Sequence, residues 1–407
     1  MESPALKAEH ERYARVEQLR LGGVPVEVEW MPYGTSADDR AAPEIVAGYG
    51  LLELEYAAFR RGAAVVDRSC RGTIAAWGAD RVEFMNRLVT QELKGMAPGD
   101  VRAGFLLNRK GRIDADLLFA EVPEPGDLPP MLVDVDIHDA AAAAAAIAGF
   151  VFSEDVRVED QSSRWARLAV HGPEGAALLS NAGADDAALE ALNHDMRCVR
   201  TALAGAPVVL VRRDQCASPG VEVFVPAADA ARAWDALVSQ HDAREGGRRR
   251  ARPAGWHAYN VARIEGGTPL HHVDFGSDSL PHESGILADR VSFRKGCYPG
   301  QEVVARMESL GKPKQRLVAL RIAEDALPTA GSPVFERGPD GEPANPVGTV
   351  TSSTLSPMLG AASVAFAMVK TAHSEPGTVL LVPAEGGRAT ATVQPALRFL
   401  PAAGAGE

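Results

Sequence analysis

One cysteine of the chain lies in a segment whose residue types could do chemistry. Cys297 stands in RKGCYPGQEVVAR, between Lys-Gly and Tyr-Pro-Gly-Gln-Glu. A cysteine reacts only as the thiolate, and its ordinary pKa of about 8.5 leaves a few per cent ionised at neutral pH. The neighbouring charges of Arg294 and Lys295 would raise that fraction, while Gly296 and Gly300 let the backbone fold tightly around the sulfur. The segment predicts a reactive thiol, and its alternative is a small buried side chain.

The other cysteines and the histidines show no metal-binding pattern. Cys70, Cys198 and Cys216 are scattered, without a CxxC pair and without histidines at zinc spacing. His271 and His272 are adjacent, so their side chains diverge and make a poor chelate. We therefore expect neither a disulfide framework nor a metal site.

Three carboxylates are candidates for ligand binding or proton transfer. Glu222 lies within the apolar strand pattern GVEVFV, where a carboxylate could hold an amidine-like ring edge, such as that of a pterin, through paired hydrogen bonds. Asp114 and Asp116 are two residues apart on a predicted strand and therefore share a face, where one could act in proton transfer. For all three, a water-facing side chain is the alternative.

Composition limits the classes of protein to consider. The chain has 407 residues, 46% of them hydrophobic, which is enough for about two or three domains with a large core. Its net charge of -12 opposes binding to nucleic acid. The sequence contains no run of about 18 apolar residues, and its charged N-terminal stretch does not resemble a signal peptide. We expect a cytoplasmic protein that binds neither nucleic acid nor membrane.

A repeated pattern supplies the elements that must position these residues. TIAAWGADRVEFMNRL and RLAVHGPEGAALLSNA each read as an apolar strand, a glycine turn, an acidic residue and an amphipathic helix. Gly78 and Gly172 permit a sharp turn, and Asp80 and Glu174 would stand in the first helical turn. The repeat predicts a duplicated α+β layer.

The C-terminal part has a different character. From about Leu317 onward, short alternating segments such as RLVALRI and TVLLV are separated by turn residues, which predicts a small β-barrel. The predicted organisation is α+β, with an N-terminal arm over residues 1–45, a duplicated core over 46–312 and a C-terminal β-barrel domain over 313–407.

The segment KGCYPGQEVVAR resembles the signature of the YgfZ-type folate-binding proteins, relatives of the glycine-cleavage T-protein in the aminomethyltransferase superfamily. The resemblance extends over most of the chain, through AAVVDRSCRGTIAAWG, PGDVRAGFLLNRKGRIDADLLF, GVEVFVP and ARIEGGTPLHHVDF. It implies a folate-binding core of duplicated α+β units closed by a C-terminal barrel. Tetrahydrofolate, or a one-carbon derivative of it, would bind in a central opening.

The resemblance also assigns residues. Glu222 matches the acid that grips the pterin in T-protein-like members, and Arg263 with Glu265 matches an R-x-E-x-G stretch near the folate pocket. Lys295 and Gln301 belong with Cys297 to the YgfZ-type motif and are expected near the cofactor. Asp116, or Asp114, falls where T-proteins carry two adjacent aspartates; here an alanine separates them, which argues against aminomethyl transfer.

Two functions follow from the resemblance. The first is a tetrahydrofolate-binding factor in iron-sulfur cluster assembly or repair, with Cys297 as functional thiol and iron-sulfur enzymes or assembly proteins as partners. The alternative is a tetrahydrofolate-dependent aminomethyl- or methyltransferase in which Asp116 or Asp114 is essential. A scaffold that keeps the fold without ligand is the third possibility.

Overall fold

The computed structural model describes residues 6–34, 43–238, 251–385 and 387–402. These residues form two compact units. The first unit contains residues up to 86, 93–103 and 117–259, and the second contains 87–92, 104–116 and the residues from 260 onward. Each unit is therefore assembled from segments far apart in the sequence. The bounds of the three predicted domains stay predictions.

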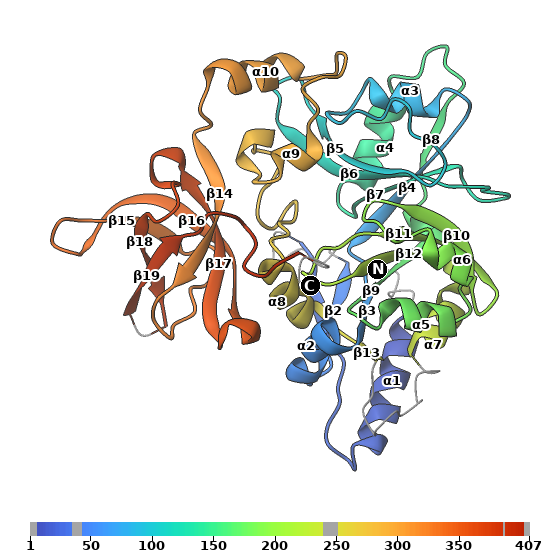
Figure 1. Ribbon diagram of the computed structural model, residues 1–407, viewed down its shortest axis with the longest axis horizontal. Coiled ribbons are helices and arrows are strands. Elements are labelled where there is room, and N and C mark those ends of the chain that lie inside the picture. The colour runs from blue at the N-terminus through green and yellow to red at the C-terminus, as the bar shows by residue number, and fades with distance from the viewer. Residues whose placement is uncertain (1–5, 35–42, 239–250, 386, 403–407) are drawn as a thin grey trace. The chain divides into compact units, whose positions relative to one another are not determined.

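A six-stranded sheet forms one layer of the first unit, in the order β10-β11-β12-β9-β3-β13. Its strands are β3 (Ala63–Asp67), β9 (Trp165–His171), β10 (Cys198–Leu203), β11 (Ala206–Arg212), β12 (Gly220–Pro226) and β13 (Ala251–Pro253). Alternate residues of β9 and β12 pack with helices α1 (Lys7–Arg20), α5 (Gly175–Asn181) and α7 (Ala230–Val238) in one apolar cluster. Figure 1 shows these helices gathered beside β3 and β9. The opposite face of β9 and β12 packs against the second sheet of this unit.

The second layer is a five-stranded sheet in the order β5-β6-β7-β4-β8. Its strands are β4 (Arg71–Trp77), β5 (Val101–Leu107), β6 (Ile113–Glu121), β7 (Met131–Asp136) and β8 (Arg157–Asp160). Ala75 and Leu132 of this sheet share a buried cluster with Trp165 and Phe224 of the other sheet. The helix α3 (Arg81–Asn86) follows β4, and α4 (Ala140–Ala148) follows β7; the short α6 (Asp186–Glu190) lies between α5 and β10 of the other sheet.

The predicted repeat is present as two strand-turn-helix units. The strand β4 leads through Gly78 to α3, and β9 leads through Gly172 to α5. The φ angles of the two glycines are 101° and 122°, and a Cβ there would lie 1.9 Å from the Asp155 carbonyl and 2.3 Å from the Gly62 carbonyl. Glycine is required at both turns because the backbone passes too closely for a side chain.

The N-terminal arm packs into the first unit. It contains α1 and β1 (Glu29–Pro32) and ends within β2 (Glu44–Gly48), which is followed by the helix α2 (Leu52–Arg61). His10 of α1 is fully buried, and its ring nitrogens lie 2.6 Å from the Tyr49 hydroxyl and 2.8 Å from the Asp67 carboxylate. These contacts make the arm part of the core of this unit.

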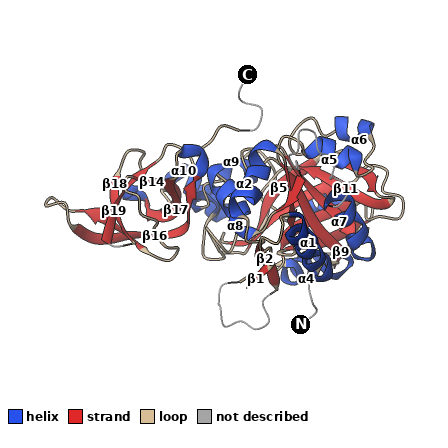
Figure 2. Ribbon diagram, turned by 90° about the horizontal axis from the view of Figure 1, so that it is seen from below, coloured by secondary structure: helices blue, strands red, loops and turns tan. Residues whose placement is uncertain are grey.

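The C-terminal part folds as a closed barrel in the order β14-β17-β16-β15-β18-β19, as expected. Its strands, red in Figure 2, are β14 (Gln315–Ile322), β15 (Pro333–Arg337), β16 (Pro343–Ser356), β17 (Ala362–Lys370), β18 (Val379–Ala384) and β19 (Gly387–Val393). Three helices precede it along the chain, namely α8 (Trp256–Glu265), α9 (Leu287–Arg290) and α10 (Gln301–Leu310). Among the described residues, none of the helices has the length and apolar character needed to cross a membrane.

Candidate folate-binding site

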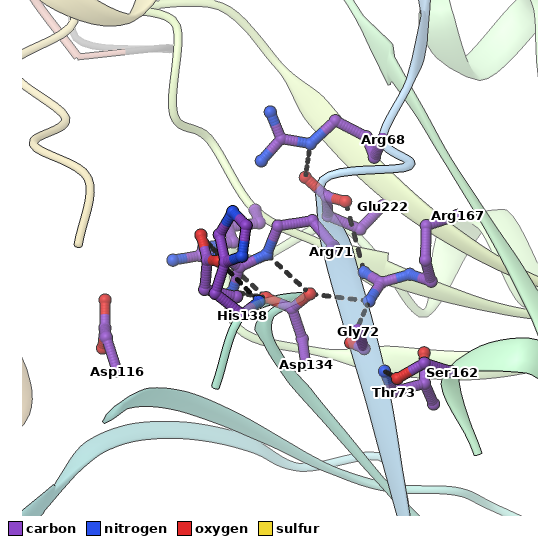
Figure 3. A network of polar contacts seen from close by, with 12 residues as sticks. Arg68, Arg71, Gly72, Thr73, Asp116, Asp134, His138, Ser162, Arg167 and Glu222 are labelled. Carbon is purple, nitrogen blue, oxygen red and sulfur yellow. Dashed lines mark hydrogen bonds and ion pairs between the residues drawn. The ribbon is translucent and has the colours of Figure 1, made fainter. Parts of the chain in front are cut away.

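A buried ionic cluster lies between the two sheets of the first unit (Figure 3). We call it the arginine cluster; its members are Arg68, Arg71, Arg167, Arg213, Asp134, Asp136 and Glu222. The residues come from the ends or inner faces of β3, β4, β7, β9, β11 and β12. Strand alternation explains the placement, because Arg167 and Glu222 fall on the faces of β9 and β12 opposite the helix-packed positions.

Asp134 is the centre of this cluster. Its carboxylate accepts hydrogen bonds from Arg71 at 2.7 and 3.1 Å and from Arg167 at 2.6 Å, and Arg213 lies 3.3 Å away. Burial alone would raise the pKa of Asp134, but the charges of Arg71, Arg167 and Arg213 outweigh it and hold that pKa well below its ordinary value. Asp134 is thus a fixed anion that orients three guanidinium groups.

The carboxylate of Glu222 is engaged by the chain's own residues. It is 1% exposed, and its Oε2 accepts a hydrogen bond from Arg167 at 3.4 Å. Oε1 accepts one from the Gln215 amide at 3.3 Å, in the amide orientation that satisfies its neighbours, and lies 3.7 Å from Arg68 Nε. These contacts fix the carboxylate in place, and since each oxygen can accept more than one hydrogen bond, the pterin contact of Glu222 stays a prediction.

A cavity of about 480 Å³ opens beside the arginine cluster in the same unit. Its lining includes Arg71, Arg167, Ser162, Ser163 and Trp165. Such a volume is within the range of small-molecule sites. The first unit thus combines a pocket with fixed guanidinium groups.

His171, at the end of β9, is a buried neutral base on the same sheet. It stacks on Phe59 with ring centroids 5.7 Å apart, and neither ring nitrogen has a hydrogen-bond partner among the described residues. Burial, aided by the nearby charge of Arg68, lowers the pKa of His171 to about 3.

In the second unit, Asp116 forms an ion pair with Arg290. The Asp116 Oδ1 accepts from Arg290 Nε at 2.7 Å, and the Oδ2 lies 3.4 Å from a terminal nitrogen of the same guanidinium. Both side chains are largely buried. Asp114 is exposed and accepts a hydrogen bond from the Asn108 amide at 2.8 Å. Of the two aspartates, Asp116 is the one held in a defined position.

The predicted thiol segment forms a loop before α10. Cys297 is exposed, whereas the other three cysteines are buried. Lys295 is buried and donates from Nζ to the Val89 and Gln91 carbonyls at 2.5 and 3.0 Å, and burial lowers its pKa to about 8. Gln301 is the first residue of α10 and is partly buried. Lys295 thus anchors the loop, while its role and that of Gln301 towards a cofactor stay predictions.

Arg263 and Glu265, both fully buried on α8, are bound within the second unit. Arg263 donates to Asp274 at 2.7 Å and to Ser352 at 2.6 Å, and the Glu265 carboxylate accepts from Ser356. Both serines belong to the barrel strand β16. These contacts give the two residues a structural role, and a folate contact for either remains a prediction.

The arginine cluster was missed from the sequence except for Glu222. Charged residues inside otherwise apolar strands, as in VVDRSCR, MLVDVD and WARLAV, were the available signal. A charge in a strand with two buried faces must find a partner, but the sequence does not say which strand supplies it.

Comparison with known proteins agrees with this architecture. Residues 48–295 match the family model of the GCVT N-terminal domain, and residues 315–399 match that of the glycine cleavage T-protein C-terminal barrel domain. The aminomethyltransferase of Bacillus subtilis is 28% identical over 86% of this chain and 91% of its own length. A probable aminomethyltransferase of Halobacterium salinarum is 28% identical over 84% of this chain and 89% of its own length.

A solved structure shares the fold. The glycine cleavage system aminomethyltransferase T of Bartonella henselae superposes with a TM-score of 0.79, covering 98% of each chain at 22% identity. The first family match alone spans more than half of the chain. With its α+β core and closed C-terminal barrel, this chain belongs to the glycine cleavage T-protein family.

Proposed function

We propose that this protein transfers a one-carbon group between an amine-bearing donor and tetrahydrofolate. The observation that carries the proposal is the match of both T-protein domains, together with relatives named aminomethyltransferase that align over more than four fifths of the chain. This was the alternative at the sequence level, and the comparisons support it better than a role in iron-sulfur cluster maintenance.

The reaction balances without an oxidant when the donor carries an aminomethyl group. Its carbon is at the oxidation level of formaldehyde, so two new C–N bonds replace the bond to ammonia and the bond to the carrier, which leave as ammonia and protonated carrier. Tetrahydrofolate supplies the two nitrogens that accept this carbon. The protein's contribution is then to position the reactants and to place charge near them.

Asp116 is the residue we assign to proton transfer. Arg290 fixes the carboxylate through Oδ1, and the contact of Oδ2 is the longer one at 3.4 Å. Oδ2 is therefore the oxygen better placed to take a proton from an attacking amine. The single alanine between Asp114 and Asp116 leaves one positioned acid instead of two adjacent ones.

The test is transfer of ¹³C from an aminomethyl thioether donor to tetrahydrofolate, followed by mass spectrometry. Asp116→Asn removes the proton acceptor but keeps the shape, and we expect it to lower the rate by 100-fold or more, within the range of about 10² to 10⁴ typical of general bases. Asp114→Asn is the matched control and should keep most of the activity, because that side chain is exposed.

A second candidate function rests on Cys297, the exposed cysteine of the four. As a thiol-dependent factor for iron-sulfur proteins, the chain would need Cys297 but not Asp116. Cells deleted for the gene would regain aconitase activity under oxidative stress with the wild-type protein and not with Cys297→Ala. Loss of transfer in Asp116→Asn with normal activity in Cys297→Ala would exclude this second function.

A further inference from the structure

One arginine holds the carboxylate of Asp116. Arg290 Nε donates to Oδ1 at 2.7 Å, and Nη2 of the same guanidinium donates to Oδ2 at 3.4 Å. The two side chains are only 12% and 14% exposed. Within the part of the chain that the structure describes, no other group hydrogen-bonds to this carboxylate. The orientation of Asp116 therefore depends on where Arg290 stands.

The backbone of Arg290 is fixed by Thr90, a fully buried residue. The Thr90 hydroxyl donates to the Arg290 carbonyl at 2.6 Å and accepts from the Phe105 amide at 2.8 Å. The Thr90 amide also donates to the Phe105 carbonyl at 3.0 Å. We call Thr90 with these bonds the Thr90 brace. It ties the end of α9 to β5, the neighbour of the strand β6 that carries Asp116.

The strand β5 leaves room for this brace at Gly104. A Cβ there would lie 2.8 Å from the Gln91 Cβ and 3.6 Å from the Arg290 carbonyl oxygen. The Gln91 amide donates to the Asp289 carbonyl at 3.3 Å, so a second bond holds the same end of α9. Arg290 is thus set in place by its backbone, independently of its contact with Asp116.

We propose that Arg290 is a positioning residue for the carbon transfer, and that the Thr90 brace sets its place. The inference rests on the proposed function and deepens it. Arg290 keeps Oδ1 of Asp116 occupied and leaves Oδ2 for the amine that gives up its proton. A guanidinium suits this task because its donors form a rigid fork, whereas a lysine is a point charge on a flexible chain. Misplacement of a reacting group by about 1 Å can lower a rate by about 100-fold.

Transfer of ¹³C from an aminomethyl thioether to tetrahydrofolate tests this assignment in the full-length protein. Arg290→Ala should lower kcat by about 10- to 100-fold and change the KM for tetrahydrofolate by less than about 3-fold. Added guanidinium, at about 20 mM and far below denaturing concentrations, should restore part of the lost kcat. Arg290→Lys keeps the charge without the fork, so its kcat should lie between those of Arg290→Ala and the wild type.

A double-mutant cycle separates positioning from a general structural role. In the Asp116→Asn background, Arg290→Ala should lower kcat by less than about 2-fold more, because the group that Arg290 orients is already lost. The brace is tested in the same assay. Thr90→Val removes the hydroxyl and should lower kcat, whereas Thr90→Ser keeps the hydroxyl and should not.

Arg109→Ala is the matched control, because it removes an exposed arginine from the turn between β5 and β6. It should keep its kcat and show no response to guanidinium. Urea unfolding of each variant separates loss of rate from loss of the fold. A kcat of Arg290→Ala within about 2-fold of the wild type would overturn the inference, as would an additive loss in the double variant. A wild-type protein that transfers no ¹³C would instead overturn the proposed function.

Discussion

At the scale of single residues, His171 makes the acid stability of the protein predictable. The unfolded chain takes up a proton on this ring near pH 6.5, whereas the native state resists it until about pH 3. Because the unfolded state binds more protons in that window, stability falls as the pH is lowered through it, by at most about 1.4 kcal/mol per pH unit.

We expect His171→Phe to remove this dependence, since phenylalanine keeps an aromatic ring against Phe59 and does not titrate. Urea unfolding at pH 7.5, 6.5, 5.5 and 5.0 should show the wild-type protein losing more stability than the variant at each step below pH 6.5. The difference at pH 7.5 measures the change in packing alone. Parallel losses in the two proteins would contradict the prediction.

The sequence allowed some of these residues to be singled out and hid others. Cys297 and Asp116 were visible because a thiol between glycines and two acids on one strand face are local patterns. The hydrogen bonds of Glu222 could not be predicted from the sequence, since its partners Arg167 and Gln215 come from other segments of the chain. Pairing between strands distant in sequence decides whether a buried acid is free for a ligand.

At the scale of elements, the cysteine loop depends on one of its two glycines. Gly300 has a φ of 80°, and a Cβ there would lie 2.6 Å from the Asn108 carbonyl oxygen. At Gly296 the φ is not positive, and a Cβ would meet nothing within 4 Å. The expectation that both glycines shape the loop is therefore wrong for Gly296, where neither the backbone angle nor the available space requires a glycine.

Gly300→Ala should destabilise the protein by at least about 1 kcal/mol, because both the backbone angle and the close contact oppose a side chain. Gly296→Ala, four residues before Gly300 in the same loop, should change the free energy of unfolding by less than about 0.5 kcal/mol. Denaturant unfolding of the pair gives the comparison. Equal effects of the two substitutions would mean that the loop is not held against Asn108.

The elements themselves were largely predictable. The strands β4, β9, β12 and the barrel strands show apolar runs or alternation bounded by turn residues, which are signals read within a few positions. The strand β15 was not anticipated, because its five residues are mostly part-buried or exposed and carry little pattern. The order of the strands in each sheet could not be predicted, because it depends on pairing between strands that are distant in the sequence, as the ion pairs of the arginine cluster do.

At the scale of the whole molecule, the resemblance to a known family predicted how the domains are arranged along the chain, which the hydrophobic periodicity of single segments does not give. The duplicated core and the closed barrel follow the T-protein family, to which the chain belongs. Assembly of each unit from separate segments could not be derived from local patterns, because β5 and β6 each contribute residues to both units. Whether the protein uses the thiol of Cys297 or transfers carbon with Asp116 likewise depends on which residues the fold brings together, which local patterns do not show.

The most direct test of the account is a calorimetric titration of the wild-type protein with tetrahydrofolate under anaerobic conditions. The account predicts saturable heat with one folate bound per chain, and a raised unfolding temperature in the presence of the ligand. A titration that shows neither saturable heat nor stabilisation, with a protein that is folded by its unfolding transition, would contradict it.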